Sequence, residues 1–263
     1  MNKQFIADLN LIREKAPLVH NITNYVVMNN TANALLAIGA SPVMAHAVEE
    51  VNDMITIASV LVINMGTLSE KWVEAMLLAG KAAHKKGIPV VFDPVGVGAT
   101  PYRNQVAASI VNICKPSVIR GNASEIMSLA KENTSTKGVD STASSNEALD
   151  AAKRLAQQTG AIIVISGEED FITDGQTVCS VKNGSALMPK VTGMGCTATA
   201  IVGAFAAVNS NYLKAATHAM AVMGVAGEIA AKKADGPGTM QLHFLDALHN
   251  LTCETLSEQA KIS

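Results

Sequence analysis

Short apolar runs alternate with longer segments of helical periodicity along most of the chain, and this alternation constrains the fold more than any other feature. Such alternation is typical of βαβ units that build a parallel sheet. No repeat and no linker interrupts it, so we expect residues 1–263 to form a single α/β domain. The expected strands are 18–20, 41–44, 60–63, 89–92, 117–119 and 161–165.

Glycine, proline and hydroxyl residues mark the ends of the segments between these runs. Gly39 and Gly87 follow helical periodicity as C-terminal caps, and Thr100 with Pro101 begins a helix. Two further runs, joined across Asp174 and Gly175, predict a hairpin. The expected helices are 8–15, 31–38, 48–58, 69–86, 147–158, 213–233 and 240–261, and the hairpin strands are 171–173 and 177–179. The polar, Ser/Thr-rich stretch 132–146 is expected to be a mobile surface loop.

Composition and charge exclude several classes of function. The net charge is −2 with no basic stripe, and aromatic residues make up 3% of the chain, which argues against nucleic acid as a partner. No apolar run reaches the ~18 residues that a membrane span needs. The N-terminal segment lacks the apolar centre of a signal peptide, and the four cysteines are widely spaced. We therefore expect a cytoplasmic protein with reduced thiols and no membrane partner.

Polar groups recur where strands end. They are found at 20–24, 93–98, 120–125 and 166–167. The carboxyl ends of parallel strands meet at one edge of a sheet, and ligands bind in the crevice outside that edge. We therefore expect these groups to converge on one site.

The stretch VTGMGCTATA at 191–200 is a glycine-rich loop that leads into an apolar helix. Two glycines allow a tight turn, and the free N–H groups and dipole at a helix N-terminus favour an anion such as phosphate. Cys196 lies at this N-terminus, where we expect the pKa of its thiol to be lowered, although a lone cysteine is more often a small buried hydrophobe. The stretch also fits GxGxxA, but it comes late in the chain and no acid follows that could hold a ribose.

Two carboxylates near the strand ends are open to more than one interpretation. Asp93 precedes a proline and could initiate a turn or bind Mg²⁺. Asn122 and Glu125 have the spacing of a capping box, which needs no ligand, although Glu125 could also hold a metal or a metal-bound water. Arg120, beside them, could contact phosphate.

Taken together, six stretches resemble the hydroxyethylthiazole kinase family, whose members have the ribokinase-like fold. They are HNITNYVVMNNTAN (20–33), ASPVMAHAVEE (40–50), VFDPVGVGAT (91–100), RGNASEI (120–126), SGEEDFITDG (166–175) and VTGMGCTATA (191–200). The resemblance implies a three-layer α/β/α architecture with a mainly parallel central sheet. It also implies transfer of the ATP γ-phosphate, with Mg²⁺, to the primary hydroxyl of 4-methyl-5-(2-hydroxyethyl)thiazole in thiamine biosynthesis or salvage.

The resemblance assigns the nucleotide and metal contacts to four residues. Arg120 and Ser166 would contact the nucleotide, and Asp93 and Glu125 would serve the metal. Family members are homotrimers with the thiazole pocket between neighbouring subunits, which implies the same assembly here.

The resemblance assigns the thiazole pocket to Asn24 and Met44, with Gly193 touching the substrate. Cys196 stands where most ribokinase-like kinases carry an aspartate base, and this family carries cysteine. Two roles for Cys196 stay open, a modest catalytic base or a small positioning group. Two other functions also stay open: a ribokinase-like kinase of another small alcohol, and a non-catalytic nucleotide-binding module.

Overall fold

The central feature of the protein is an eight-stranded sheet with the order β2-β1-β3-β4-β5-β6-β7-β8. The computed structural model describes residues 2–132 and 145–263. The strands are β1 (Leu18–Ile22), β2 (Ser41–Val43), β3 (Val60–Asn64), β4 (Val90–Asp93), β5 (Val118–Asn122), β6 (Ile162–Ser166), β7 (Asp170–Thr173) and β8 (Val178–Val181). Neighbours from β2 to β6 pair in parallel, whereas β7 and β8 pair antiparallel. The mainly parallel sheet is therefore confirmed.

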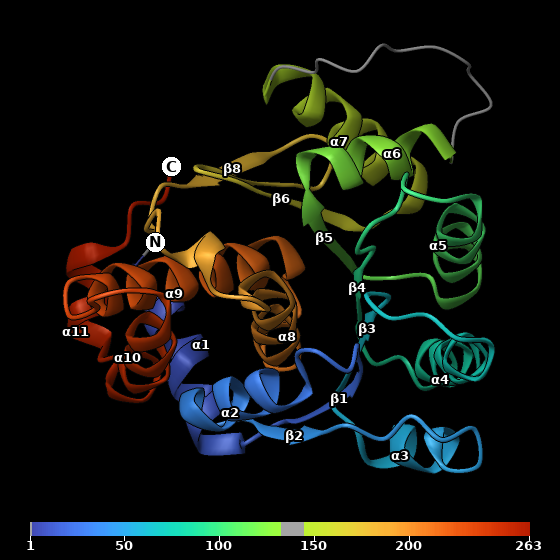
Figure 1. Cartoon of the computed structure of the whole chain (residues 1–263), viewed down its shortest axis with the longest axis horizontal. Coiled ribbons are helices and arrows are strands. Elements are labelled where there is room, and N and C mark those ends of the chain that lie inside the picture. The colour runs from blue at the N-terminus through green and yellow to red at the C-terminus, as the bar shows by residue number, and fades with distance from the viewer. Residues whose placement is uncertain (1, 133–144) are drawn as a thin grey trace.

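Helices cover both faces of this sheet (Figure 1). One face carries α3 (Val51–Ile57), α4 (Glu70–Lys86), α5 (Pro101–Cys114), α6 (Ala123–Glu132) and α7 (Ser145–Thr159). The other carries α1 (Asn2–Lys15), α2 (Met28–Ile38), α8 (Met194–Ala206), α9 (Tyr212–Ala231), α10 (Pro237–Asn250) and α11 (Cys253–Gln259). This arrangement is the expected three-layer α/β/α architecture.

Side-chain alternation along the strands divides the core between the two faces. In β3, Val60 and Val62 belong to the cluster under α8 and α9, whereas Leu61 and Ile63 belong to the cluster under α4 and α5. All of these side chains are buried. A strand that is covered on both faces has no polar side, which explains the continuous apolar runs in the sequence.

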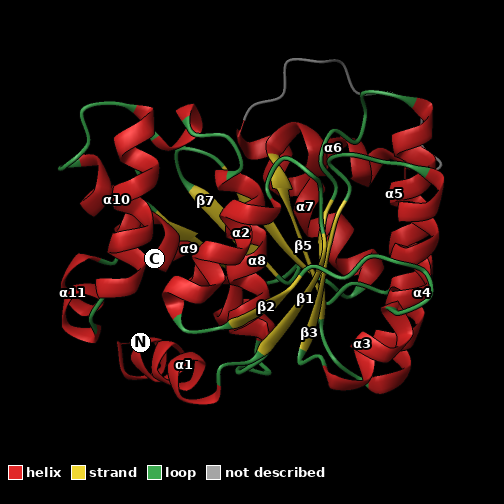
Figure 2. Ribbon diagram, turned by 60° about the horizontal axis from the view of Figure 1, so that its bottom comes forward, coloured by secondary structure: helices red, strands yellow, loops and turns green. Residues whose placement is uncertain are grey.

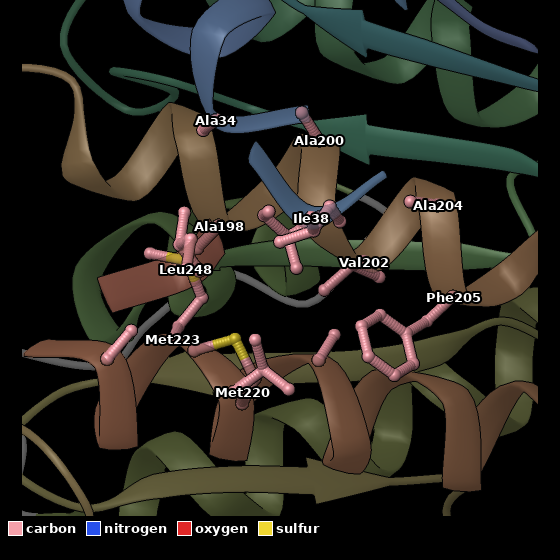
Figure 3. Close-up of a cluster of buried hydrophobic side chains, with 14 of the residues drawn as sticks. Ala34, Ile38, Ala198, Ala200, Val202, Ala204, Phe205, Met220, Met223 and Leu248 are labelled. Carbon is pink, nitrogen blue, oxygen red and sulfur yellow. The ribbon is translucent and has the colours of Figure 1, made fainter. Parts of the chain in front are cut away.

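Helix α8 lies at the centre of one layer and is apolar on nearly all sides, as expected for a buried helix (Figure 3). Its close approach to the sheet depends on Gly203, where a Cβ atom would lie 2.7 Å from Val62 Cγ2. The glycine-rich loop at the start of α8 is thereby fixed against the sheet.

Several expected boundaries differ from the structure. The predicted single helix 240–261 is wrong, because α10 ends at Asn250 and α11 begins at Cys253. Leu251 between them has extended backbone angles, and the Thr252 hydroxyl caps α11 by accepting a 3.1 Å hydrogen bond from the Thr255 amide. Helix α1 begins at Asn2, before the expected start. Most of the predicted mobile loop, residues 133–144, lies outside the described residues.

The hairpin prediction is confirmed. Strands β7 and β8 are joined by a turn in which Asp174 Oδ1 accepts hydrogen bonds from the amides of Gln176 and Thr177. Over the described ranges, no helix combines the length and apolar character required to cross a bilayer.

Candidate active site

The strands of the central sheet lie side by side between the two helical layers (Figure 2). Polar side chains at or just after the carboxyl ends of the parallel strands converge at one edge, where α8 also begins. Asn24 follows β1, Asn64 ends β3 and Asp93 ends β4. Arg120 lies in β5 and Ser166 ends β6. The convergence predicted from the sequence is therefore confirmed.

Buried hydrogen bonds join Asp93 to both sides of the site. Asn64 Nδ2 donates to Asp93 Oδ2 at 2.8 Å, and the Thr199 hydroxyl donates to the same oxygen at 2.7 Å. Asn24 Nδ2 donates to Asn64 Oδ1 at 2.8 Å, which extends the chain to the end of β1. Burial raises the pKa of Asp93 to about 6, against the charge of Arg120 and the hydrogen bond from Thr199.

Cys196 lies beside this row of hydrogen bonds, with its Sγ atom 3.5 Å from Asn24 Nδ2. Burial, and then the nearby charge of Asp93, raise the pKa of its thiol to about 11. The lowered pKa expected from the helix N-terminus is therefore wrong, because loss of solvent and a neighbouring carboxylate outweigh the helix dipole. The thiol is neutral at pH 7.

Arg120 places a guanidinium against the start of α8. Its side chain is 8% exposed, and Nη2 donates a 2.7 Å hydrogen bond to the Ser166 hydroxyl. A Cβ atom at Gly195 would lie 2.8 Å from Arg120 Nη1, so the glycine makes room for the cation. Nε is buried and has no protein partner among the described residues. A cation and free helix amides at one point form an anion site.

Glu125 acts as the acid of the expected capping box. Asn122 Oδ1 accepts from the Glu125 amide at 2.9 Å, and Glu125 Oε2 accepts from the Asn122 amide at 2.9 Å. The other carboxylate oxygen accepts a 2.8 Å hydrogen bond from the Gly96 amide, in the loop after β4. Glu125 is therefore a cap that also contacts a loop of the site, and its charge contributes to the raised pKa of Asp93.

The two carboxylates, of Asp93 and Glu125, fit Mg²⁺ better than they fit a metal ion that is coordinated by protein ligands alone. Within the described ranges, no group of three His, Cys, Asp or Glu residues could hold a metal ion. Mg²⁺ commonly binds through one or two carboxylates together with phosphate oxygens and water. Asp93 is buried, and its contacts do not fully offset the cost of ionising its carboxyl group. Glu125 is near enough to raise the pKa of Asp93 further. Both features fit a cation that arrives with phosphates.

The residues expected in the thiazole pocket come from three loops, after β1 (Asn24), after β2 (Met44) and before α8 (Gly193). Gly193 has φ +84°, which favours glycine, and a Cβ atom there would lie 2.8 Å from Val27 Cγ1. Met44 is half-buried and follows the edge strand β2, where its carbonyl accepts a 3.1 Å hydrogen bond from His46 Nδ1. Within the part of the chain that the structure describes, no hydrogen bond links Met44 to Gly193 or to Asn24.

The structure adds two residues that the sequence did not single out for the site, Asn64 and Thr199. Both contact the same oxygen of Asp93. Asn64 directly follows the apolar run 60–63, so the rule that polar residues at strand ends face the site could have found it. Thr199 lies one turn inside α8, and only the tertiary structure shows that it meets Asp93.

Space for a ligand opens beside the anion site. A cavity of about 520 Å³ is lined by Ser166, Gly167, Phe171 and neighbouring residues, a size that suits a small-molecule ligand. A second cavity, of about 460 Å³, lies at the opposite end of the sheet beside Lys115 and Tyr212. The first lies at the carboxyl ends of the strands, where ligands bind in open α/β sheets.

This fold is the ribokinase-like fold of small-molecule kinases. A pyridoxal kinase structure from Staphylococcus aureus in complex with AMP-PCP has a TM-score of 0.65 and 16% sequence identity, and covers 83% of this chain and 90% of its own. At that identity the likeness concerns the fold alone. The anion site at the start of α8 lies at the carboxyl edge of that fold.

The chain belongs to the hydroxyethylthiazole kinase family, which matches residues 9–254, and is thus a kinase. A hydroxyethylthiazole kinase of Leptospira biflexa is 56% identical over 257 residues, covering 98% of this chain and 96% of the relative. One of Syntrophus aciditrophicus is 55% identical, covering 97% and 95%. A hydroxyethylthiazole kinase structure from Pyrococcus horikoshii OT3 has a TM-score of 0.93 at 41% identity and covers 99% of this chain and 98% of its own.

Proposed function

We propose that this kinase transfers the γ-phosphoryl group of ATP to the primary hydroxyl of 4-methyl-5-(2-hydroxyethyl)thiazole, as in thiamine biosynthesis or salvage. The observation that carries the proposal is the anion site formed by Arg120, Gly195 and the first amides of α8, beside Asp93. Family membership and relatives that carry this name support the choice of substrate.

Phosphoryl transfer has a loose transition state, so positioning and charge stabilisation provide most of the catalysis. The amides of 193–196 and the helix dipole face the charge that develops on the transferred group. Arg120 and Ser166 would contact the nucleotide and hold its phosphates at this helix end. Gly193 allows the loop to approach the substrate closely, with Asn24 and Met44 on the alcohol side.

We propose that Asp93 and Glu125 hold Mg²⁺. When bound, the ion neutralises phosphate oxygens and orients them. Asn64 and Thr199 fix the orientation of the Asp93 carboxylate, and Gly96 fixes that of Glu125. These contacts leave further lone pairs on the carboxylate oxygens for a cation.

Cys196 serves this reaction as a neutral, small group that positions the substrate hydroxyl and acts at most as a modest base. Its thiol pKa of about 11 supports this role, because little thiolate forms near pH 7. Proton loss late in a loose transition state reduces the need for a strong base.

We also propose a homotrimer with active sites between subunits. Edge strand β2 and the exposed apolar side chains of Tyr25, Val26 and Leu36 lie on the Met44 side of the molecule and support it. The four cysteines are free thiols, which supports a cytoplasmic location.

The test is an assay of the purified protein with Mg-ATP and a panel of alcohols, scoring ADP release and the mass of the product. We expect turnover with the thiazole alcohol and little with sugar or pyrimidine alcohols. Preferred turnover of another alcohol would contradict the substrate. ATP binding without turnover on any alcohol would instead support a non-catalytic module.

A further inference from the structure

Arg103 joins two loops that end in the active site. It lies in the first turn of α5, and its guanidinium donates to three main-chain carbonyls. Nη1 donates to Met65 O at 2.7 Å and to Val95 O at 2.6 Å, and Nη2 donates to Gly66 O at 2.8 Å. The carbonyls belong to the loops after β3 and β4, so one side chain fixes the distance between them.

The loop after β3 controls the Asn24–Asn64 side of the site. The Gly66 amide donates a 3.0 Å hydrogen bond to Asn64 Oδ1, the same oxygen that accepts from Asn24. A Cβ atom at Gly66 would lie 2.6 Å from Asn24 Nδ2. A shift of this loop would therefore move Asn64 away from Asp93.

The loop after β4 controls the Glu125 side. Val95, which Arg103 holds, precedes Gly96, whose amide donates to Glu125 Oε1 at 2.8 Å. The next residue of α5 reinforces this hold, because Asn104 Oδ1 accepts a 2.7 Å hydrogen bond from the Gly98 amide. A shift of this loop would remove the hydrogen bond from the Gly96 amide to Glu125.

We propose that Arg103 is a positioning residue for phosphoryl transfer. It acts by holding the Asn64–Asp93 pair and Glu125 at fixed positions relative to each other. The inference rests on the proposed function. Arg103 acts through the backbone, whereas the nearby cation that lowers the pKa of Asp93 is Arg120. A planar guanidinium reaches several acceptors in fixed directions, which a lysine ammonium cannot reproduce.

The test compares Arg103→Lys and Arg103→Gln with the control Arg13→Lys. Arg13 makes the same kind of contact far from the site, because its Nη2 donates to His249 O at 3.2 Å and to Leu251 O at 2.8 Å. Two measurements are needed for each protein. One is amide hydrogen exchange at Gly66 and Gly96, and the other is the rate of thiazole phosphorylation as a function of Mg²⁺ concentration.

We expect both Arg103 variants to exchange the amides of Gly66 and Gly96 at least tenfold faster, with unchanged exchange in β3 and β4. We expect kcat/KM to fall roughly 10–100-fold and more Mg²⁺ to be needed, because misplacement by about 1 Å can cost that much. Arg13→Lys should change none of these values. Unchanged exchange at both glycines, equal acceleration throughout the sheet, or wild-type kinetics would each overturn the inference. An inactive wild-type protein would overturn the proposed function instead, while the exchange data would still report whether Arg103 holds the loops.

Discussion

The Thr199 hydroxyl donates a 2.7 Å hydrogen bond to Asp93 Oδ2, across 106 residues of sequence. This contact joins the helix that begins at the glycine-rich loop to the end of β4. The anion site and the expected metal ligand are therefore parts of one hydrogen-bonded unit.

Thr199→Val removes this donor while keeping the volume similar. The hydrogen bond lowers the pKa of Asp93, so its loss should raise that pKa further. If catalysis needs the carboxylate, the acid limb of the pH profile of kcat/KM moves to higher pH. We expect a stability loss of about 1–2 kcal/mol. Thr199→Ser keeps the hydroxyl and should leave the acid limb of the profile unchanged. An unchanged acid limb in Thr199→Val would contradict the proposal that Thr199 lowers the pKa of Asp93.

Asp93→Asn should stabilise the free protein at high pH while removing most activity. Burial raises the folded-state pKa of Asp93 from 3.8 to about 6. Folding therefore favours the protonated Asp93 carboxyl group. The stability that this group contributes is fully present below pH 3.8 and is lost as pH rises through 6. The difference corresponds to about 3 kcal/mol at most.

Urea unfolding at pH 4.5 and pH 8, without nucleotide or Mg²⁺, measures this effect. The gain from Asp93→Asn should be larger at pH 8. Asp174→Asn provides a control whose effect should have the opposite sign, a loss of stability. The reason is that hydrogen bonds from Gln176 and Thr177 lower the pKa of Asp174. A gain from Asp93→Asn that is independent of pH would show that ionisation of Asp93 costs nothing in the folded state.

Cys196→Ala should lower kcat without abolishing turnover, and Cys196→Asp should keep or raise it. The reason is that a thiol with a pKa of about 11 supplies little base catalysis near neutral pH, whereas a carboxylate supplies more. Steady-state kinetics with ATP binding measured in parallel decide the matter. Cys179→Ala, at a free thiol in β8, serves as control. Complete loss of turnover in Cys196→Ala, with ATP still bound, would indicate an essential thiol.

Residues at strand ends were predictable because topology alone places them. A parallel sheet brings the carboxyl ends of its strands to one edge, so Asp93 and Ser166 could be assigned to one site from the sequence, together with Arg120, which the structure places inside β5, two residues before its end. The capping box of Asn122 and Glu125 was predictable for another reason, since it depends only on a spacing of three residues.

Contacts between distant segments were not predictable in this way. The direction of the Cys196 pKa shift depends on burial and on the carboxylate of Asp93 at the end of β4, whereas the sequence displayed only the local helix end. Arg103 reaches carbonyls 37 and 38 residues earlier in the chain, and no local pattern marks such contacts. The break at Leu251 and Thr252 was hidden because apolar residues continue across it and two extended residues leave little trace.

Glu125→Ala tests whether the capping box also serves the metal. If Glu125 holds Mg²⁺, we expect the Mg²⁺ concentration for half-maximal rate to rise at least tenfold. Asn122→Ala is the matched control, since it breaks the same capping box from the other end and leaves the carboxylate in place. Each variant should lose about 1 kcal/mol of stability. Equal Mg²⁺ dependence in the two variants would restrict Glu125 to capping.

Gly195→Ala tests the anion site without touching a charged residue. The added Cβ atom would lie 2.8 Å from Arg120 Nη1, so the guanidinium must move away from the start of α8. Gly195 lies in the first turn of a helix, where alanine is the better helix former, so stability should change little. We expect KM for ATP to rise roughly 10–100-fold, by loss of a charge-assisted contact worth roughly 1.5–3 kcal/mol. Gly238→Ala in α10, where a Cβ atom meets nothing within 4 Å, should leave KM unchanged. Equal ATP affinity in the two variants would mean that Arg120 does not bind the nucleotide from its observed position, and the phosphate site would have to lie elsewhere along the sheet edge.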